Sequence, residues 1–509
     1  MRFPSWLAGL FGALGLWACP EQAPPAIDPG GVFNSASRMP APLSGSAIAR
    51  GSRFLIRGQR LGPADGTRAQ VSVRAGSSRA VVVTAGPESV EAILPADAPL
   101  GPANLSISYC AQTSAVFPIT VAQASPGLYS ANGEGWGPAQ TGGSGPLRRG
   151  QAAALLGTGF GRVTDPVQIF VGGIAARDVR RTRGNAPGLD VIRFPVPADA
   201  PEGCYVPVQA RIGRIVSNTV TLAIASGACS DAHNWMAAQS QVQRGGFAIL
   251  AHVVARISGA QSPLALDAGL ASFTAAAQSR AIHPLLMLPP IGACAASAGR
   301  TQGFSLPPAL AEWGGAGLDA GEIFLRSPAG LVRTLAKLAS RPGTYAGWLG
   351  SEGLPPFITQ TRFAPLPAGP YEFSGQGGKD VGPFRAAVTL RQPVHSIAPE
   401  VVDRSHDLEV HWENGSPEEL ALILAFGMDR ATGTYGVAVC PANAGSGQIT
   451  IPAIALANIP ATPSEEALPA GLIVAATIPA KAPQAAPAPG LDRFTAIGAA
   501  ASAASVKFR

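Results

Sequence analysis

The stretch RGQAAALLGTGFG (residues 149–161) has a counterpart 99 positions earlier, RGSRFLIRGQRLG (residues 50–62). Four residues occupy the same positions in the two stretches. Arg50 corresponds to Arg149, Gly51 to Gly150, Gly58 to Gly157 and Gly62 to Gly161. Two copies of one small domain are the simplest explanation of this shared spacing.

The sequence on either side of these stretches repeats in the same order. The pentapeptide PADAP occurs at 95–99 and again at 197–201, and the strand-like run at 70–73 is answered by 168–171. Apolar and polar residues alternate at the end of each copy, which is typical of strands with one buried face. About 100 residues with seven or so short strands predict an immunoglobulin-like sandwich.

Composition supports an all-β protein of several domains. The chain has 509 residues, with 61 glycines and 48 prolines, which favours many turns and few long helices. Only 13% of residues are charged and 47% are hydrophobic, which provides ample material for packed cores. The net charge of +6 is small for this length, so no nucleic-acid partner is predicted.

The first residues resemble an export signal. A short basic start at Arg2 precedes an apolar stretch that ends near residue 18, too short for a membrane span. Residues 1–18 are therefore predicted to be a signal peptide and residues 19–30 a proline-rich spacer. Cys19 follows the apolar stretch and could be lipidated after cleavage, or could be a free cysteine of the mature terminus. The expected location is secreted or cell-surface, with membrane attachment only through such a lipid.

The remaining chain is divided into four predicted domains. Residues 31–123 and 124–230 are the two immunoglobulin-like domains, 231–393 a β-rich domain of uncertain type, and 394–509 a last sandwich. Within the third, 247–257 and 264–273 are expected strands, whereas 331–338 fits a helix or a strand.

Several short motifs resemble known families. GTGFG (157–161), PADAP and SNTVTLAIA (217–225) resemble IPT/TIG-type immunoglobulin-like domains. The pair also resembles tandem domains of uncharacterised secreted bacterial proteins, through GVFNSAS (31–37) and GWGPA (135–139). LEVHWENG (408–415) is similar to a strand of a fibronectin-III-like domain whose tryptophan packs between sheets. These resemblances imply a fold and export, and they imply no defined activity.

Export favours disulfides over metal binding for the cysteines. Cys204 opens the penultimate strand of the second repeat and Cys229 follows its last strand, so both are expected at one end of a hairpin and are predicted to pair. Two buried free thiols are the alternative. Cys294 with Cys440 is a weaker prediction. Cys110 would then be unpaired, or would pair with Cys19.

No catalytic, cofactor or metal site is predicted. Ser144 and Ser351 each lack a glycine that a nucleophile elbow requires. His406 and His411 are five positions apart, which places them on opposite faces of a strand. The carboxylates Asp403, Asp407 and Glu409 do not follow a calcium-loop pattern, and Glu418 and Glu419 resemble a surface turn.

One basic cluster could bind an anion. It consists of Arg177, Arg180, Arg181 and Arg183. An anionic glycan or lipopolysaccharide is the ligand that such a patch would suit. The alternative is a solvated loop in which Asp178 partly compensates the charge.

The sequence therefore predicts an exported, non-enzymatic scaffold or adhesion protein, with an extracellular glycan or surface protein as possible partner. An alternative is a carbohydrate-binding or carbohydrate-active protein with residues 231–393 as its working domain. A cleft holding two carboxylates, or an aromatic row that uses Trp313 or Trp348, would favour that alternative. A third possibility is a substrate-capturing lipoprotein.

Overall fold

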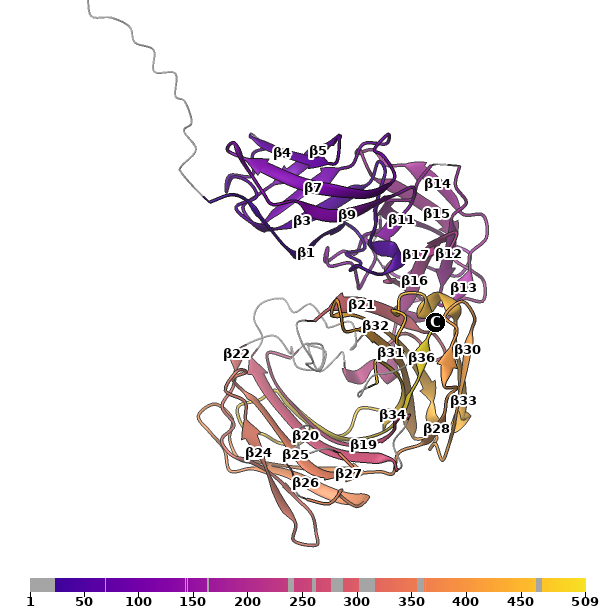
Figure 1. Cartoon of the computed structure of the whole chain (residues 1–509). Coiled ribbons are helices and arrows are strands. Elements are labelled where there is room, and N and C mark those ends of the chain that lie inside the picture. Colours follow the sequence, from indigo (N-terminus) through magenta and orange to yellow (C-terminus); the bar gives the residue numbers. More distant parts are fainter. Residues whose placement is uncertain are drawn as a thin grey trace, which may run out of the picture.

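The protein is all-β, and two sandwich modules precede a large curved β-domain in chain order (Figure 1). The computed structural model describes residues 23–68, 70–141, 143, 145–162, 164–236, 242–258, 262–275, 287–301, 316–354, 361, 363–463 and 469–509. The predicted signal peptide, Cys19, Ser144 and Trp313 lie outside the described residues.

The first module is a path of strands in the order β1-β3-β6-β5-β4-β7-β9-β2, with β8 added to β7. The path folds over at β5, so that Phe54 and Val90 from one half share a core with Val73 and Ile107 from the other. The elements are β1 (Ala26–Asn34), η1 (Ser44–Ser46), β2 (Ile48–Ala49), β3 (Arg53–Gln59), β4 (Val71–Ala75), β5 (Ser78–Ala85), β6 (Ser89–Ile93), β7 (Gly101–Tyr109), β8 (Gln112–Thr113) and β9 (Phe117–Ala122).

The second module packs one sheet of order β10-β11-β15-β14 against another of order β13-β12-β16, in which β17 and β18 both pair with β16. Its strands are β10 (Gly127–Leu128), β11 (Ala152–Thr158), β12 (Gln168–Val171), β13 (Ile174–Ala175), β14 (Arg180–Arg183), β15 (Asp190–Pro195), β16 (Gly203–Ile212), β17 (Ile215–Val216) and β18 (Val220–Ile224). A core of its own fills the space between these two sheets.

The two modules have the same topology. Strand β3 pairs with β1 and β6, and the corresponding β11 pairs with β10 and β15. Strand β7 pairs with β4, β8 and β9, and the corresponding β16 pairs with β12, β17 and β18. Even the parallel contact of Ile48 with Val121 has its equivalent in the bridge between Leu147 and Ile224. The duplication that the repeated motifs predict is therefore present in three dimensions.

The structure explains why both repeated motifs recur together. The Arg50 Nε donates a hydrogen bond to the carbonyl of Ala98, and Arg149 Nε donates to the carbonyl of Ala200 at 2.8 Å. Both alanines are the fourth residue of a PADAP turn and are buried. Each leading arginine therefore fastens its own PADAP turn to the sandwich.

The C-terminal domain is built on one long sheet of 13 strands within the described residues, in the order β21-β32-β31-β34-β35-β19-β20-β25-β24-β23-β26-β27, with β22 on β20. Its strands are β19 (Arg244–Arg256), β20 (Leu264–Ala275), β21 (Ala295–Arg300), β22 (Ala316–Gly317), β23 (Ile323–Arg326), β24 (Val332–Lys337), β25 (Thr344–Glu352), β26 (Gly369–Gly375), β27 (Phe384–Leu390), β31 (Glu419–Asp429), β32 (Thr434–Asn443), β34 (Gly471–Pro479) and β35 (Arg493–Ser505).

This sheet corrects the predicted boundary at residue 393. Strand β35 pairs in parallel with β19, and β32 pairs with β21, so 231–393 and 394–509 share one sheet rather than forming two domains. Alternation along a strand shows which face is buried, but it does not show which distant strand is the partner. Residues 332–337 are strand, which settles the ambiguity at 331–338.

Three cores lie against this long sheet, and one of them gathers Trp235, Phe247 and Leu288. Further strands cover the other two. In one, β23, β26 and β27 turn back over β19, β20 and β35 and enclose Phe273, Phe373 and Phe494. In the other, a small sheet covers β31, β32 and β34, and Trp412 packs between the two sheets with its Nε1 donating to Ala444 O at 2.6 Å. The smaller elements are η2 (Ala232–Asn234), β28 (His395–Ile397), β29 (Val401–Val402), β30 (Leu408–Glu413), η5 (Ala444–Ser446), β33 (Gln448–Ile451), α2 (Ala453–Leu456) and β36 (Lys507–Phe508).

Disulfides join two pairs of cysteines for which both partners are described. Cys204 and Cys229 are bridged at a Cα–Cα distance of 5.2 Å, as their place at one end of the β16–β18 hairpin predicts. Cys294 and Cys440 are bridged across the β21–β32 pair, which confirms the weaker prediction. Cys110 is also disulfide-bonded. Disulfides are typical of oxidising compartments.

Candidate functional site

Several buried polar groups of the described residues lie at the junctions between modules. Asn34 ends β1 and is fully buried. Its Oδ1 accepts hydrogen bonds from the backbone N–H groups of Ala36 (2.9 Å) and Ser37 (3.1 Å). Its Nδ2 donates to Ser125 O, at the start of the second module, at 2.8 Å. One amide thus shapes the turn after β1 and fastens it to the next module.

A second set of hydrogen bonds reinforces this first junction. The Thr158 Oγ1 accepts from the backbone N–H of Arg53 at 2.9 Å and donates to Gly188 O at 2.6 Å. The Ser35 hydroxyl lies 2.7 Å from that of Tyr129, and burial raises the pKa of Tyr129 to about 12. Because these groups are paired across the junction, separating the modules would break their hydrogen bonds and replace them with bonds to water.

Replacing Asn34 with alanine tests this junction. We expect the free energy of unfolding to fall by about 2 kcal/mol, because two backbone donors and the Ser125 carbonyl lose their partner. Thermal and chemical denaturation of the full chain would measure the loss. Asn104→Ala is the matched control, because Asn104 is exposed on β7 of the same module. Equal effects of the two substitutions would contradict the assignment.

The second junction joins module two to the C-terminal domain. Gln209 on β16 donates through Nε2 to Ile454 O on α2 at 3.2 Å, and Asn458 donates through Nδ2 to Ser217 O at 2.8 Å. Both amides are almost completely buried. The short helix α2 therefore bonds with the second module through groups that have no access to water.

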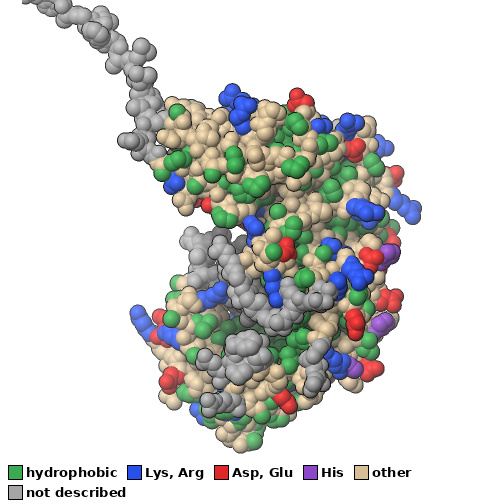
Figure 2. Space-filling view, viewed as in Figure 1, with side chains coloured by type: hydrophobic (Ala, Val, Ile, Leu, Met, Phe, Trp, Pro, Cys, Tyr) green, Lys and Arg blue, Asp and Glu red, His purple; other side chains and the backbone are tan. Residues whose placement is uncertain are grey.

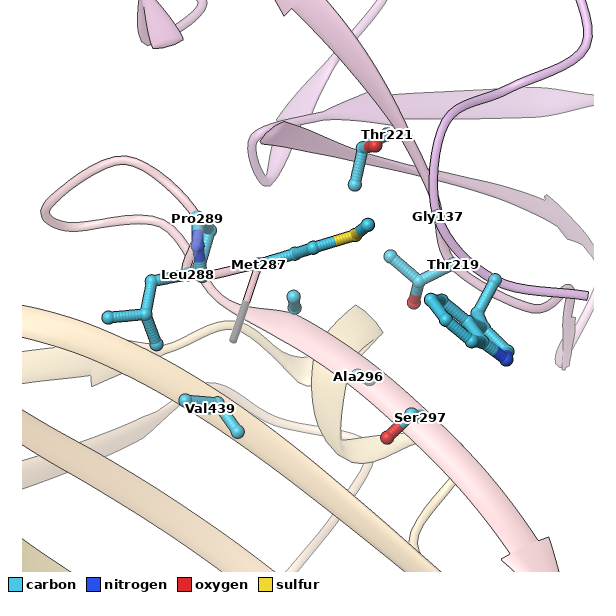
Figure 3. A pocket seen from close by; sticks show the side chains of 11 residues that line it. Gly137, Thr219, Thr221, Met287, Leu288, Pro289, Ala296, Ser297 and Val439 are labelled. Carbon is cyan, nitrogen blue, oxygen red and sulfur yellow. The ribbon is translucent and has the colours of Figure 1, made fainter. Parts of the chain in front are cut away.

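A small pocket of about 40 Å³ lies beside this junction (Figure 3). Met287 extends into it toward Thr219 of the second module, while Val439 of the long sheet lies on the opposite side. The Thr219 and Thr221 hydroxyls are buried and have no hydrogen-bond partner in the described part of the chain. The pocket is lined mainly by apolar side chains, with hydroxyl groups on both sides: Thr219 and Thr221 on the second module and Ser297 on the long sheet. It is too small for an organic ligand.

The four arginines of the predicted anion patch have different surroundings in the structure. The Arg181 side chain is 3% exposed and the Asp190 carboxylate that faces it is 1% exposed. Arg181 donates to the carbonyls of Phe160 and Gly161, and Arg183 donates to Asp190 Oδ1 at 2.9 Å. Burial lowers the pKa of Arg181 and raises that of Asp190 against the opposing effect of both arginines. Arg181 is buried against the GTGFG loop, whereas Arg183 bonds with Asp190 and with Gly161 O and stays half exposed.

Arg177, Arg180 and Arg183 are exposed, so three of the four arginines lie at the surface. On the face shown in Figure 2, basic and acidic side chains are interspersed. Anion binding by these arginines stays a prediction, and sequence alone could not show that Asp190 and the loop carbonyls already engage the buried Arg181.

A buried histidine–aspartate pair, His252 with Asp267, is not among the residues that the sequence singled out. The His252 Nδ1 lies 2.6 Å from Asp267 Oδ1, and Asp267 Oδ2 accepts the backbone N–H of Leu366 at 2.5 Å. Both side chains are buried where β19 pairs with β20. The pair fastens the segment before β26 to the hairpin.

The other residues considered in the sequence have ordinary surroundings. Ser351 lies within β25, bonded through its backbone to Phe363. His406 contacts Asp403 at 3.0 Å and His411 contacts Glu409 at 3.6 Å. Within the described residues, no three His, Cys, Asp or Glu side chains are grouped so as to hold a metal ion. In the same residues no helix has the length and hydrophobicity needed to cross a membrane.

The chain has low-identity similarity to several solved structures of multi-domain proteins. No family model and no curated protein matches the chain. Domains 4–9 of the surface-layer protein SbsC align at 10% identity over 94% of this chain and 65% of theirs, with a TM-score of 0.19. The plexin A4 extracellular region aligns at 14% identity and a TM-score of 0.18 over 38% of this chain, which spans 17% of that protein. Domains A168–A170 of titin align at 8% identity over 65% and 89% of the two chains, with a TM-score of 0.15.

Proposed function

We propose that this protein is an exported, non-enzymatic scaffold in which two immunoglobulin-like modules of the IPT/TIG type are held rigidly on a larger β-domain. The observation that supports rigidity best is the buried hydrogen bonding at both junctions, through Asn34 at the first and Gln209 and Asn458 at the second. Relative motion is the default between domains of one chain, so buried contacts that oppose it are needed for rigidity. A scaffold of this kind holds a partner, such as an extracellular glycan or another surface protein, at a fixed distance from the point where the scaffold itself is attached.

Disulfides support export, because they persist in oxidising compartments and are rare in the cytosol. Expressing the gene with its own first residues in a bacterial host, then fractionating the cells, would test this. We expect the protein outside the cytoplasm, and mass spectrometry of its N-terminus would show whether Cys19 carries a lipid. Full-length, unprocessed protein confined to the cytoplasm would contradict the proposal.

Rigidity can be tested in solution by small-angle X-ray scattering. The full chain is expected to scatter as one particle with a single maximum dimension. The double variant Gln209→Ala/Asn458→Ala should increase that dimension, because the second junction loses its buried side-chain donors. Gln112→Ala, which alters an exposed amide on β8, is the control. A broad, multi-conformer profile for the unmodified protein would disprove the rigid scaffold.

A further inference from the structure

A cleft of about 610 Å³ opens where the last strand of the long sheet turns back over its middle. Strand β27 forms one wall, the adjoining ends of β31 and β34 form the other, and β35 contributes to the floor. We name it the Glu419 cleft, and its lining includes Thr389, Arg391, Glu418, Glu419, Lys481 and Ile497. Its volume lies within the range of small-molecule sites, about 300–1,000 Å³.

Charged groups from both walls meet in this cleft. Arg391 follows β27, and its guanidinium lies 3.4 Å from Glu419 and 3.7 Å from Glu418 on the opposite wall. Both contacts are longer than the roughly 2.7–2.9 Å of a charge-assisted hydrogen bond, so these donors and acceptors retain bonding capacity. The Glu419 side chain is only 11% exposed. Burial raises its pKa, Arg391 opposes that shift and Glu418 reinforces it.

The charge balance and the surroundings indicate the class of ligand. Two carboxylates and two cations, Arg391 and Lys481, line the cleft, so the site has no net charge and suits a neutral ligand with many hydroxyl groups. The floor and rim are aliphatic, with Pro417, Pro479 and Pro483 next to the charged groups. Apolar surface combined with a few convergent polar groups is the usual composition of small-ligand sites.

A peptide that added as an extra strand would not fit beside β27. Gly498 of β35 lies so close to Thr389 O that a Cβ on this glycine would be 1.9 Å from that oxygen. Strand β35 therefore blocks the outer edge of β27 at Thr389, so an incoming strand could not pair along the full length of β27. Side chains are the main groups that this cleft offers for recognition.

We propose that the Glu419 cleft binds a neutral oligosaccharide, with Arg391, Glu418 and Glu419 hydrogen-bonding to adjacent hydroxyl groups and the prolines contacting the sugar rings. The cleft residues form no part of either junction, so this binding goes beyond the scaffold function and can fail independently of it. In a scaffold, it would provide the point of attachment to a glycan surface.

Binding can be measured with the full-length protein on an array of neutral glycans, followed by titration calorimetry with maltohexaose, cellohexaose and chitohexaose. We expect at least one neutral glycan to bind. Glu419→Gln should weaken that binding about tenfold, and Arg391→Ala should reduce it further. Arg385→Ala is the matched control, because Arg385 lies on the same strand, is 81% exposed and is outside this cleft.

Thermal denaturation of each variant separates loss of binding from loss of folding, since Glu419→Gln keeps the shape of the side chain. The proposal is overturned if no neutral glycan on the array binds. It is also overturned if binding is unchanged in folded Arg391→Ala and Glu419→Gln proteins, or if a peptide library binds this cleft instead. The scattering experiment on module rigidity is unaffected by any of these outcomes.

Discussion

Replacing Gly157 with valine is expected to lower the free energy of unfolding of the second module by about 3 kcal/mol, with little direct effect on the first module. A Cβ at this position would lie 2.5 Å from the Phe160 ring and 2.7 Å from Gly127 O. Strand β11 pairs there with β10 on one side and β15 on the other, so the backbone cannot move aside. Phe160 is itself fully buried, and its ring has no space into which to turn.

Hydrogen exchange resolved by peptide, together with denaturant titration of the full chain, would measure this effect module by module. Ala152→Val is the control, since Ala152 is exposed on the same strand. Gly58→Val should produce the corresponding loss in the first module, where a Cβ would lie 2.0 Å from Ala26 O. Unchanged exchange in the second module of Gly157→Val would show that this glycine is not required by the packing of its module.

The repeat made much of the fold predictable from sequence. Arg50 and Arg149, with the two PADAP turns, identified equivalent positions in two sandwiches, and alternation located strands such as β20 within two residues of their observed ends. The long sheet was not predictable. Its central pairing joins β19 to β35, which are separated by more than 200 residues, and nothing local in either strand specifies the other.

Local sequence does not show which distant segment a residue will contact, and this explains which functional groups were missed. Asn34 lies in a motif noted only for its resemblance, and its role depends on Ser125 of the next module. His252 and Asp267 are directly opposed in a hairpin, so pairing β19 with β20 in sequence would have brought them together. Glu419 was read as part of a surface turn, yet it is buried against Arg391 because β27 turns back over the sheet.

Replacing Asp190 with alanine is expected to cost about 3–5 kcal/mol, because it would leave the Arg181 guanidinium buried without a counter-charge. Arg181 cannot reach water in the folded module, since its side chain is 3% exposed and donates to the carbonyls of the GTGFG loop. Asp190 therefore supplies the negative charge that compensates the buried Arg181 guanidinium. Chemical denaturation of the full chain would measure the loss, with Asp178→Ala on the exposed neighbouring loop as the control.

The double variant Arg181→Met/Asp190→Ala distinguishes a buried charge from a general loss of packing. If the cost comes from the unpaired guanidinium, the double variant should be more stable than Asp190→Ala alone, because methionine fills similar space without a charge. If Arg181 served mainly to bind an external anion, Asp190→Ala would leave stability nearly unchanged. The loop that carries the repeated glycines would then be held by its own backbone, and the recurrence of Gly58 and Gly62 as Gly157 and Gly161 would need an explanation other than packing.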